Sequence, residues 1–87
     1  MKRKDGFIVR QIADQNIVVA VGEASKIFHG MIKLNESGLF IWNCLENDVT
    51  VEDIVAAMTE RYEVDAERAA SDIKTFTDTL LEAGIIE

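Results

Sequence analysis

The chain has 87 residues, 48% of them hydrophobic and none of them proline, which suits a single domain with a modest core. Its longest apolar run has five residues, too few to span a bilayer, and no signal-peptide pattern follows the basic start, so we expect a cytoplasmic protein that does not contact membranes. The net charge of −7 combines +3 for residues 1–34 with −10 for residues 35–87, and this acidic second part is a poor platform for nucleic acid.

Three segments rich in β-branched and aromatic residues open the chain, at residues 6–12, 15–22 and 29–34. Asp14, Gln15 and Asn16 provide a turn between the first two segments. These features predict an antiparallel three-stranded meander. The link at residues 23–28 is expected to be a loop or a wide turn, with Ile27 and Phe28 directed inward.

A helix is predicted next, over residues 36–46, because the spacing of the apolar residues changes after Leu34. Asn35 is suited to cap the N-terminus of this helix, and Leu34 and Leu39 stand at the two positions of a hydrophobic staple. Apolar side chains cover most of the helix circumference, as expected for a helix packed between other elements. They are Leu39, Phe40, Ile41, Trp42, Cys44 and Leu45.

Two further helices are predicted over residues 51–61 and 66–83. Thr50 and Asp53 form a capping-box pattern before the first, and Gly84 is a C-cap glycine after the second. The second helix has a core face at helical spacing, and two apolar residues follow it as a plug: Ala69, Ile73, Phe76, Leu80, then Ile85 and Ile86. Because the strands precede the helices along the chain, the element order predicts an α+β domain.

A second row of residues lies beside the core face of the last predicted helix. It consists of Ala70, Lys74, Thr77 and Leu81. These mostly small or amphipathic side chains are consistent with a shallow shoulder of the core. They also suit one wall of a binding groove, and the pattern alone leaves both interpretations open.

Patterns for catalysis and metal binding are weak in this sequence. Cys44 is the only cysteine, which excludes an intramolecular disulfide and a thiolate cluster, and its position on the apolar helix predicts a packing role. His29 is the only histidine and has no cysteine near it, so we interpret it as a surface or strand-edge residue. The carboxylates lack the spacing of an acid/base pair, and the isolated glycines form no phosphate loop. We therefore predict a binding module, not an enzyme, with no catalytic residue, metal site or cofactor.

Three helices beside a small sheet also resemble winged helix-turn-helix domains, which raises nucleic-acid binding as an alternative. In such a domain the last helix would enter the groove of DNA. Residues 65–83 carry five acidic side chains against Arg68 and Lys74, so the reading helix would have a net charge of −3. This charge argues against nucleic acid as a partner, because affinity for DNA depends on neutralising its phosphates.

The segment "MIKLNESGLFIWNCLE", together with "TVEDIVAAMTERYEVDAERAASDIKTFTDTLLEAGIIE", resembles the PqqD-like family, whose founding member is the coenzyme PQQ synthesis protein D. The matching pieces are "LNESG", "LFIWNCL", "TVEDI", "RYEVD" and "LLEAGII", in this order. No single piece is specific, and it is the ordered set that carries the resemblance. The resemblance extends over residues 6–87.

This resemblance implies a winged-helix-like domain that acts as a peptide chaperone. Such a domain recognises the leader region of a ribosomally synthesised precursor peptide and presents it to a modifying enzyme. In the family founder this enzyme is a radical S-adenosylmethionine protein, and the pathway makes pyrroloquinoline quinone. The leader pairs with the exposed edge of the third strand and lies in a cleft walled by the third helix.

Carried onto this chain, the resemblance assigns the peptide-binding edge to the third predicted strand: His29, Gly30, Met31, Ile32, Lys33 and Leu34. The wall of the cleft is then expected from the outward row of the last helix, Ala70, Lys74, Thr77 and Leu81. An unpaired edge offers backbone donors and acceptors to a guest strand, and Lys33 and Lys74 would meet acidic residues of the leader. The same edge would also allow two copies to pair or swap strands, so a homodimer and a purely self-associating structural module are further alternatives.

Overall fold

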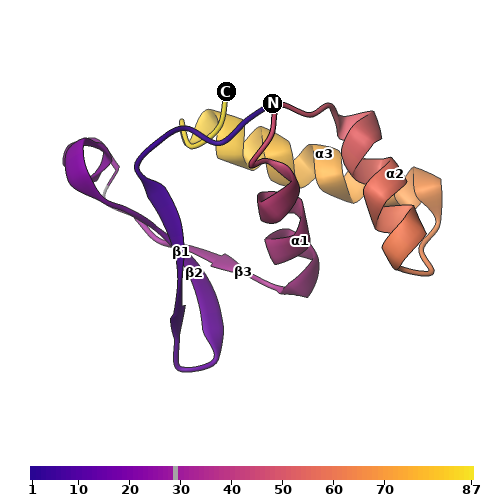
Figure 1. Cartoon of the computed structure of the whole chain (residues 1–87), viewed down its shortest axis with the longest axis horizontal. Helices are drawn as coiled ribbons and strands as arrows, with labels where there is room; N and C mark the ends of the chain where they lie inside the picture. The colour runs from indigo at the N-terminus through magenta and orange to yellow at the C-terminus, as the bar shows by residue number, and fades with distance from the viewer. Residues whose placement is uncertain (29) are drawn as a thin grey trace.

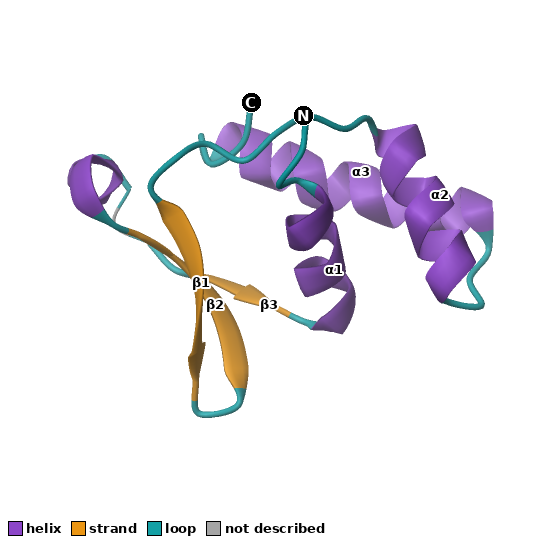
Figure 2. Ribbon diagram, viewed as in Figure 1, coloured by secondary structure: helices purple, strands orange, loops and turns teal. Residues whose placement is uncertain are grey.

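The computed structural model describes residues 1–28 and 30–87 and has the predicted α+β architecture (Figure 1). An antiparallel sheet of order β1-β2-β3 is built from β1 (Phe7–Ile12), β2 (Gln15–Ala20) and β3 (Ile32–Leu34), and a 3-10 helix, η1 (Gly22–Lys26), lies between β2 and β3. Three α-helices follow: α1 (Glu36–Cys44), α2 (Val51–Arg61) and α3 (Ala66–Glu82). Figure 2 shows the strands on one side of the molecule and the α-helices on the other, with α1 next to the sheet. Within the described residues, no helix combines the length and the apolar character needed to cross a membrane.

The hairpin of β1 and β2 closes through a two-residue turn, Ala13 and Asp14, which have φ angles of +50° and +65°. Positive φ at both central residues is the geometry of the turn that best matches the twist of antiparallel strands. Gln15 and Asn16, which were predicted to belong to the turn, are the first residues of β2. The turn is therefore shorter than the sequence suggested.

The third strand is half as long as predicted. It covers Ile32–Leu34 and pairs with Asn16, Ile17 and Val18 of β2. Gly30 and Met31 precede the strand, and the predicted strand residue His29 lies outside the described residues. The first helix ends at Cys44 instead of residue 46, and the third at Glu82 instead of residue 83.

The link before β3 also differs in part from the prediction. Ile27, expected to point inward, is 87% exposed. Phe28 does point inward, and its ring packs edge-on against Phe7 at a centroid distance of 5.6 Å. One aromatic contact thus attaches this link to the hairpin.

The helices begin where the capping patterns predicted. The Asn35 side chain accepts a hydrogen bond from the Gly38 N–H at 2.8 Å at the start of α1. At the start of α2, the Thr50 N–H donates to Asp53 at 2.9 Å, and the Asp53 N–H donates to the Thr50 hydroxyl at 3.1 Å, so the capping box is complete. These bonds satisfy backbone donors that have no partner inside the helix.

The two ends of the chain pair with each other, which the sequence did not predict. The Lys2 and Glu87 backbones exchange two hydrogen bonds of 2.8 Å, and the Lys4 N–H donates to the Ile85 carbonyl at 2.9 Å. The Arg3 N–H donates to the Leu45 carbonyl at 3.0 Å. The segment Met1–Asp5, called the N-terminal arm below, is thereby held across the end of α1 (Figure 1).

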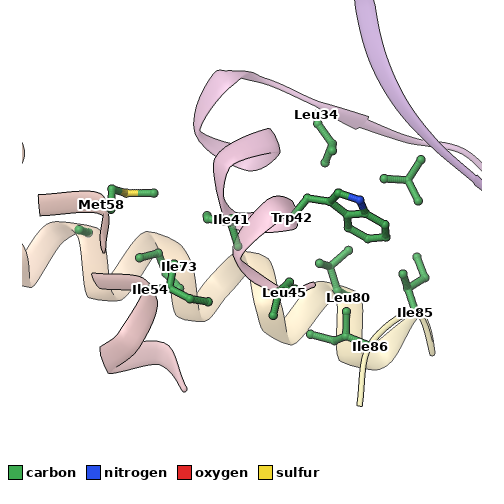
Figure 3. Close-up of a cluster of buried hydrophobic side chains, with 12 residues drawn as sticks. Leu34, Ile41, Trp42, Leu45, Ile54, Met58, Ile73, Leu80, Ile85 and Ile86 are labelled. Carbon is green, nitrogen blue, oxygen red and sulfur yellow. The ribbon is translucent and has the colours of Figure 1, made fainter. Parts of the chain in front are cut away.

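The core joins the sheet to all three helices. Trp42 of α1 is 1% exposed and lies between Leu34 of β3 and Leu80 of α3 (Figure 3). The other buried apolar residues are Val18, Ile41, Leu45, Ile54, Met58, Ala69, Ile73, Ile85 and Ile86. The predicted central role of the helix from residue 36 and the predicted apolar plug at the end of the chain are both confirmed.

Gly6 is a position where glycine is required, and substitution tests this. It has a φ of +95°, and a Cβ added there would lie 2.7 Å from the Cβ of Ala24 in η1. We expect Gly6→Ala to lower the free energy of unfolding by about 1–3 kcal/mol, because both backbone strain and a steric clash are introduced.

The matched control is Gly22→Ala, since Gly22 has a φ of +62° but open space around the added Cβ. It should lose only the backbone term, about 1–2 kcal/mol. Urea denaturation followed by circular dichroism measures both variants. An effect of Gly6→Ala no larger than that of Gly22→Ala would show that the clash with η1 is unimportant.

Candidate functional site

The ionisable groups of the described residues do not form a reactive site. Burial raises the pKa of the Cys44 thiol, which keeps it protonated and makes it a poor nucleophile at neutral pH. The N-terminal ammonium, 2.9 Å from Asp48, lowers the pKa of that exposed carboxyl. No group of three potential metal ligands comes together among the described residues. The feature that stands out is instead a sheet edge.

The ladder between β1 and β2 determines which backbone groups point out of the sheet. The Val21 N–H donates to the Gly6 carbonyl at 2.7 Å, so these two residues form a hydrogen-bonded pair. Hydrogen-bonded pairs alternate along an antiparallel ladder, which makes Ile17, four residues from Val21, bond to Arg10 of β1. The backbone groups of Asn16 and Val18 therefore point the other way, toward β3.

In β3, this alternation directs the backbone of one residue outward. Leu34 and Ile32 lie opposite Asn16 and Val18 and bond to β2. Lys33, between them, directs its N–H and C=O away from the sheet. Since β3 is last in the strand order, these two groups have no partner strand among the described residues. A guest strand could accept one bond and donate the other.

A side chain of α3 borders this edge. Phe76, half-buried, lines a hollow of about 280 Å³ together with Lys33 and Asn35. A second hollow, of about 520 Å³, contains Ala83 from the same face of α3, together with Phe28 and the exposed Ile27. Phe76 and Ala83 are seven residues apart, which places them two helical turns from each other on one flank. This flank presents apolar surface for about 10 Å, the length of three strand residues.

The predicted wall residues lie on the other flank of α3. Ala70, Lys74 and Thr77 line a separate hollow with Met1, Val51 and Glu52, beside the start of α2. On a helical wheel Lys74 and Leu81 are more than 120° from Phe76, so they cannot face β3 from the same helix. The structure therefore corrects the choice of flank, because the core stripe could be extended to either side and the sequence pattern favoured the wrong one.

Two residues of this row also differ from their predicted character. Thr77 is 1% exposed and its hydroxyl donates to the Lys74 carbonyl at 3.1 Å, so it belongs to the core. The Lys74 ammonium lies 3.0 Å from the Asp78 carboxylate and already has an acidic partner. Leu81 is 42% exposed. The interpretation of the row as a shoulder of the core fits the structure better than a wall at the strand.

The predicted edge residues have different places. Lys33 is exposed on the edge strand, whereas Ile32 is half-buried and Leu34 is 4% exposed in the core. Met31 is 69% exposed just before β3, and Gly30 precedes it against the Phe28 ring. The sixth predicted residue, His29, lies outside the described residues. The edge is thus three residues long, with exposed backbone on its N-terminal side.

Phe76, Phe28 and Ala83 are the residues near this edge that sequence analysis missed. Phe76 has the spacing of a core residue and was assigned to the core, which accounts for only one side of its ring. A signal was present in the apolar pair Ile27 and Phe28 next to the strand, since two large apolar residues in a link indicate a contact surface.

Comparisons with known proteins agree on one family. The family profile described as "Coenzyme PQQ synthesis protein D (PqqD)" matches residues 8–86. A solved structure, TbiB1 in complex with the TbiA(beta) leader peptide, is similar in fold, with a TM-score of 0.76 and 25% sequence identity. The similarity covers 100% of this chain and 95% of that one. No curated protein matches the chain.

Proposed function

The chain belongs to the PqqD family, and on that premise we propose that it is a peptide chaperone that binds the leader region of a ribosomally synthesised precursor peptide. The observation that carries the proposal is the outward backbone of Lys33 on the edge strand β3, beside the apolar flank of α3 at Phe76. The leader pairs with this edge as a fourth strand. The similarity to TbiB1, which was solved with a leader peptide, supports this mode of binding.

The short edge limits what backbone pairing contributes. Three strand residues offer a guest about two to four hydrogen bonds, each worth a net ~0.5–1.5 kcal/mol. Covering roughly 100 Å² of apolar surface along Phe76, Ala83 and Phe28 adds about 2.5 kcal/mol. Ordering the leader costs several kcal/mol, so we expect roughly micromolar affinity that depends on apolar leader residues more than on the ladder.

Lys33 supplies charge selectivity at this edge. Its side chain is exposed and has no ion-pair partner among the described residues, unlike Lys74. An acidic leader residue opposite Lys33 would gain a surface ion pair of about 0–1 kcal/mol. Leader binding should therefore weaken modestly as salt is raised.

The modifying enzyme that receives the leader is, in this proposal, a radical S-adenosylmethionine protein, and the chain itself carries out no chemistry. This follows the family founder and the synthesis of pyrroloquinoline quinone. A homodimer formed by pairing or swapping β3 would occupy the same edge. Leader and second copy are then competitors, and adding leader should dissociate such a dimer.

The proposal is tested at the wall of the edge. Phe76→Ala is expected to weaken leader binding about tenfold, because it removes most of the apolar surface beside Lys33. Isothermal titration calorimetry with the precursor peptide encoded beside the gene measures this, at a temperature where circular dichroism shows the variant folded.

Leu81→Ala is the matched control, since it removes an exposed apolar side chain from the other flank of α3. It should change the affinity by less than twofold. A loss of binding in Leu81→Ala with none in Phe76→Ala would return the wall to the row predicted from sequence and overturn the site proposed here.

A further inference from the structure

The sheet has a second open edge, on β1, far from the one assigned to the leader in the strand order. Because Arg10 and its alternate neighbours bond to β2, the backbones of Phe7, Val9 and Gln11 point outward. No backbone hydrogen bond joins them to another described residue. This edge is twice as long as β3 and goes beyond the proposed leader site.

A hollow of about 460 Å³ runs along this edge. One side is β1 from Gly6 to Val9, another is the N-terminal arm, and the third is the end of α1 with Trp42, Asn43 and Glu46. Figure 1 shows the arm passing from the end of α1 to the start of β1, so it closes one end of this space. An extended chain laid along β1 would therefore pass next to the arm.

The hollow is cationic in an acidic protein. The arm contributes Lys2, Arg3 and Lys4, against the acidic Asp5 and Glu46. None of the three cations has a carboxylate within ion-pair distance among the described residues, whereas Lys26, Arg68 and Lys74 each do. The three strands contain no acidic residue at all, although the whole chain has a net charge of −7.

The outer face of β1 adds apolar contacts to this charge. Ile8 and Ile12 are 40% and 48% exposed and lie on either side of Arg10 on that face. A strand added to β1 would place every second side chain over them. Arg3 instead turns inward, and its guanidinium lies 5.2 Å from the centre of the Trp42 ring, so this ring is not available for stacking on a base.

We propose that the β1 edge binds an extended segment of a protein partner in which acidic and apolar residues alternate. The backbone of the segment pairs with Phe7, Val9 and Gln11. Its carboxylates lie near Lys2 and Lys4, and its apolar side chains cover Ile8 and Ile12. The unpaired backbone favours a peptide over a nucleic acid, which offers no strand to extend a sheet.

The probe for this site is the synthetic peptide acetyl-Glu-Val-Glu-Val-Glu-Val-amide, titrated into the 15N-labelled chain. The amides of Phe7, Val9 and Gln11 are expected to shift, and that of Lys33 to stay unchanged. The peptide in which lysine replaces glutamate should bind at least about tenfold more weakly, and raising the salt to about 0.5 M should weaken the glutamate peptide strongly.

The double variant Lys2→Gln, Lys4→Gln should weaken binding of the glutamate peptide about five- to tenfold, since it removes two of the cations beside the edge. Arg68→Gln, Lys74→Gln removes the same charge from α3 and should have no effect. Leader binding should be unchanged in both, so this test can fail while the leader site stands, and the reverse.

Several results would overturn the proposal. They are shifts at Lys33 in place of β1, equal binding of the two peptides, or an unchanged affinity in the Lys2 and Lys4 variant. A single-stranded oligonucleotide that shifts the same amides at lower concentration would assign the edge to nucleic acid. Shifts of Phe7 and Val9 on dilution without peptide would assign it to a second copy.

Discussion

Trp42→Ala is expected to unfold most of the chain at 25 °C. Trp42 is the residue at which β3, α1 and α3 meet, and its side chain is 1% exposed (Figure 3). Removing a buried tryptophan costs about 3–5 kcal/mol. An 87-residue chain has roughly 4–13 kcal/mol of stability in total. The substitution also removes the ring that Arg3 covers, so it loosens the N-terminal arm as well.

Urea denaturation followed by far-ultraviolet circular dichroism measures this effect, because the variant lacks its only tryptophan. Ile27→Ala is the control, since Ile27 is 87% exposed and its truncation should change the stability by less than about 0.5 kcal/mol. A Trp42→Ala variant within about 1 kcal/mol of the original chain would mean that the core does not depend on this contact.

Lys33→Pro is expected to abolish measurable leader binding and to leave the fold intact. Proline removes the outward N–H of Lys33, and its ring occupies the space where a guest strand would approach. Proline is tolerated on an edge strand when its nitrogen faces outward. The loss should be at least about thirtyfold in affinity, measured by isothermal titration calorimetry with the precursor peptide.

Two further variants separate the backbone of Lys33 from its charge. Lys33→Gln keeps the N–H and should weaken binding at most about threefold, because a surface ion pair contributes little. Ile32→Pro removes an N–H that bonds to Val18 of β2, and it should destabilise the sheet itself. Normal leader binding by Lys33→Pro would mean that the leader does not pair with β3.

Much of the fold could be predicted because its signals are local. Asn35, Thr50 and Asp65 accept hydrogen bonds from residues three positions later, so the start of each helix is determined within one turn of chain. Gly84 ends the last helix with a φ of +76°, again a local requirement. The α+β class followed from the order of these elements.

The features that could not be predicted depend on distant parts of the chain. The pairing of Lys2 with Glu87 joins residues 85 positions apart, and neither segment has a strand pattern of its own. The length of β3 is set by where β2 can pair with it, which is at Asn16, Ile17 and Val18 alone. Apolar composition at residues 29–34 does not contain that information.

The candidate site was predicted only in part for the same reason. The resemblance to the PqqD family is confirmed, and it directed attention to the third strand. Which flank of α3 lies beside that strand depends on the rotation of the helix in the core. Ile73 and Leu80 anchor the helix, and Phe76 and Thr77 lie on opposite sides of that stripe. A one-residue difference in sequence thus changes which flank is chosen.

The central claim, that the leader adds to the outer edge of β3, is tested most directly by amide hydrogen exchange in the free and leader-bound chain. In the free chain the Ile32 and Leu34 amides should exchange slowly, because they bond to β2, and the Lys33 amide should exchange rapidly. The account predicts that saturating leader slows exchange at Lys33 by at least about tenfold. Unchanged exchange at Lys33, with the leader bound, would contradict it.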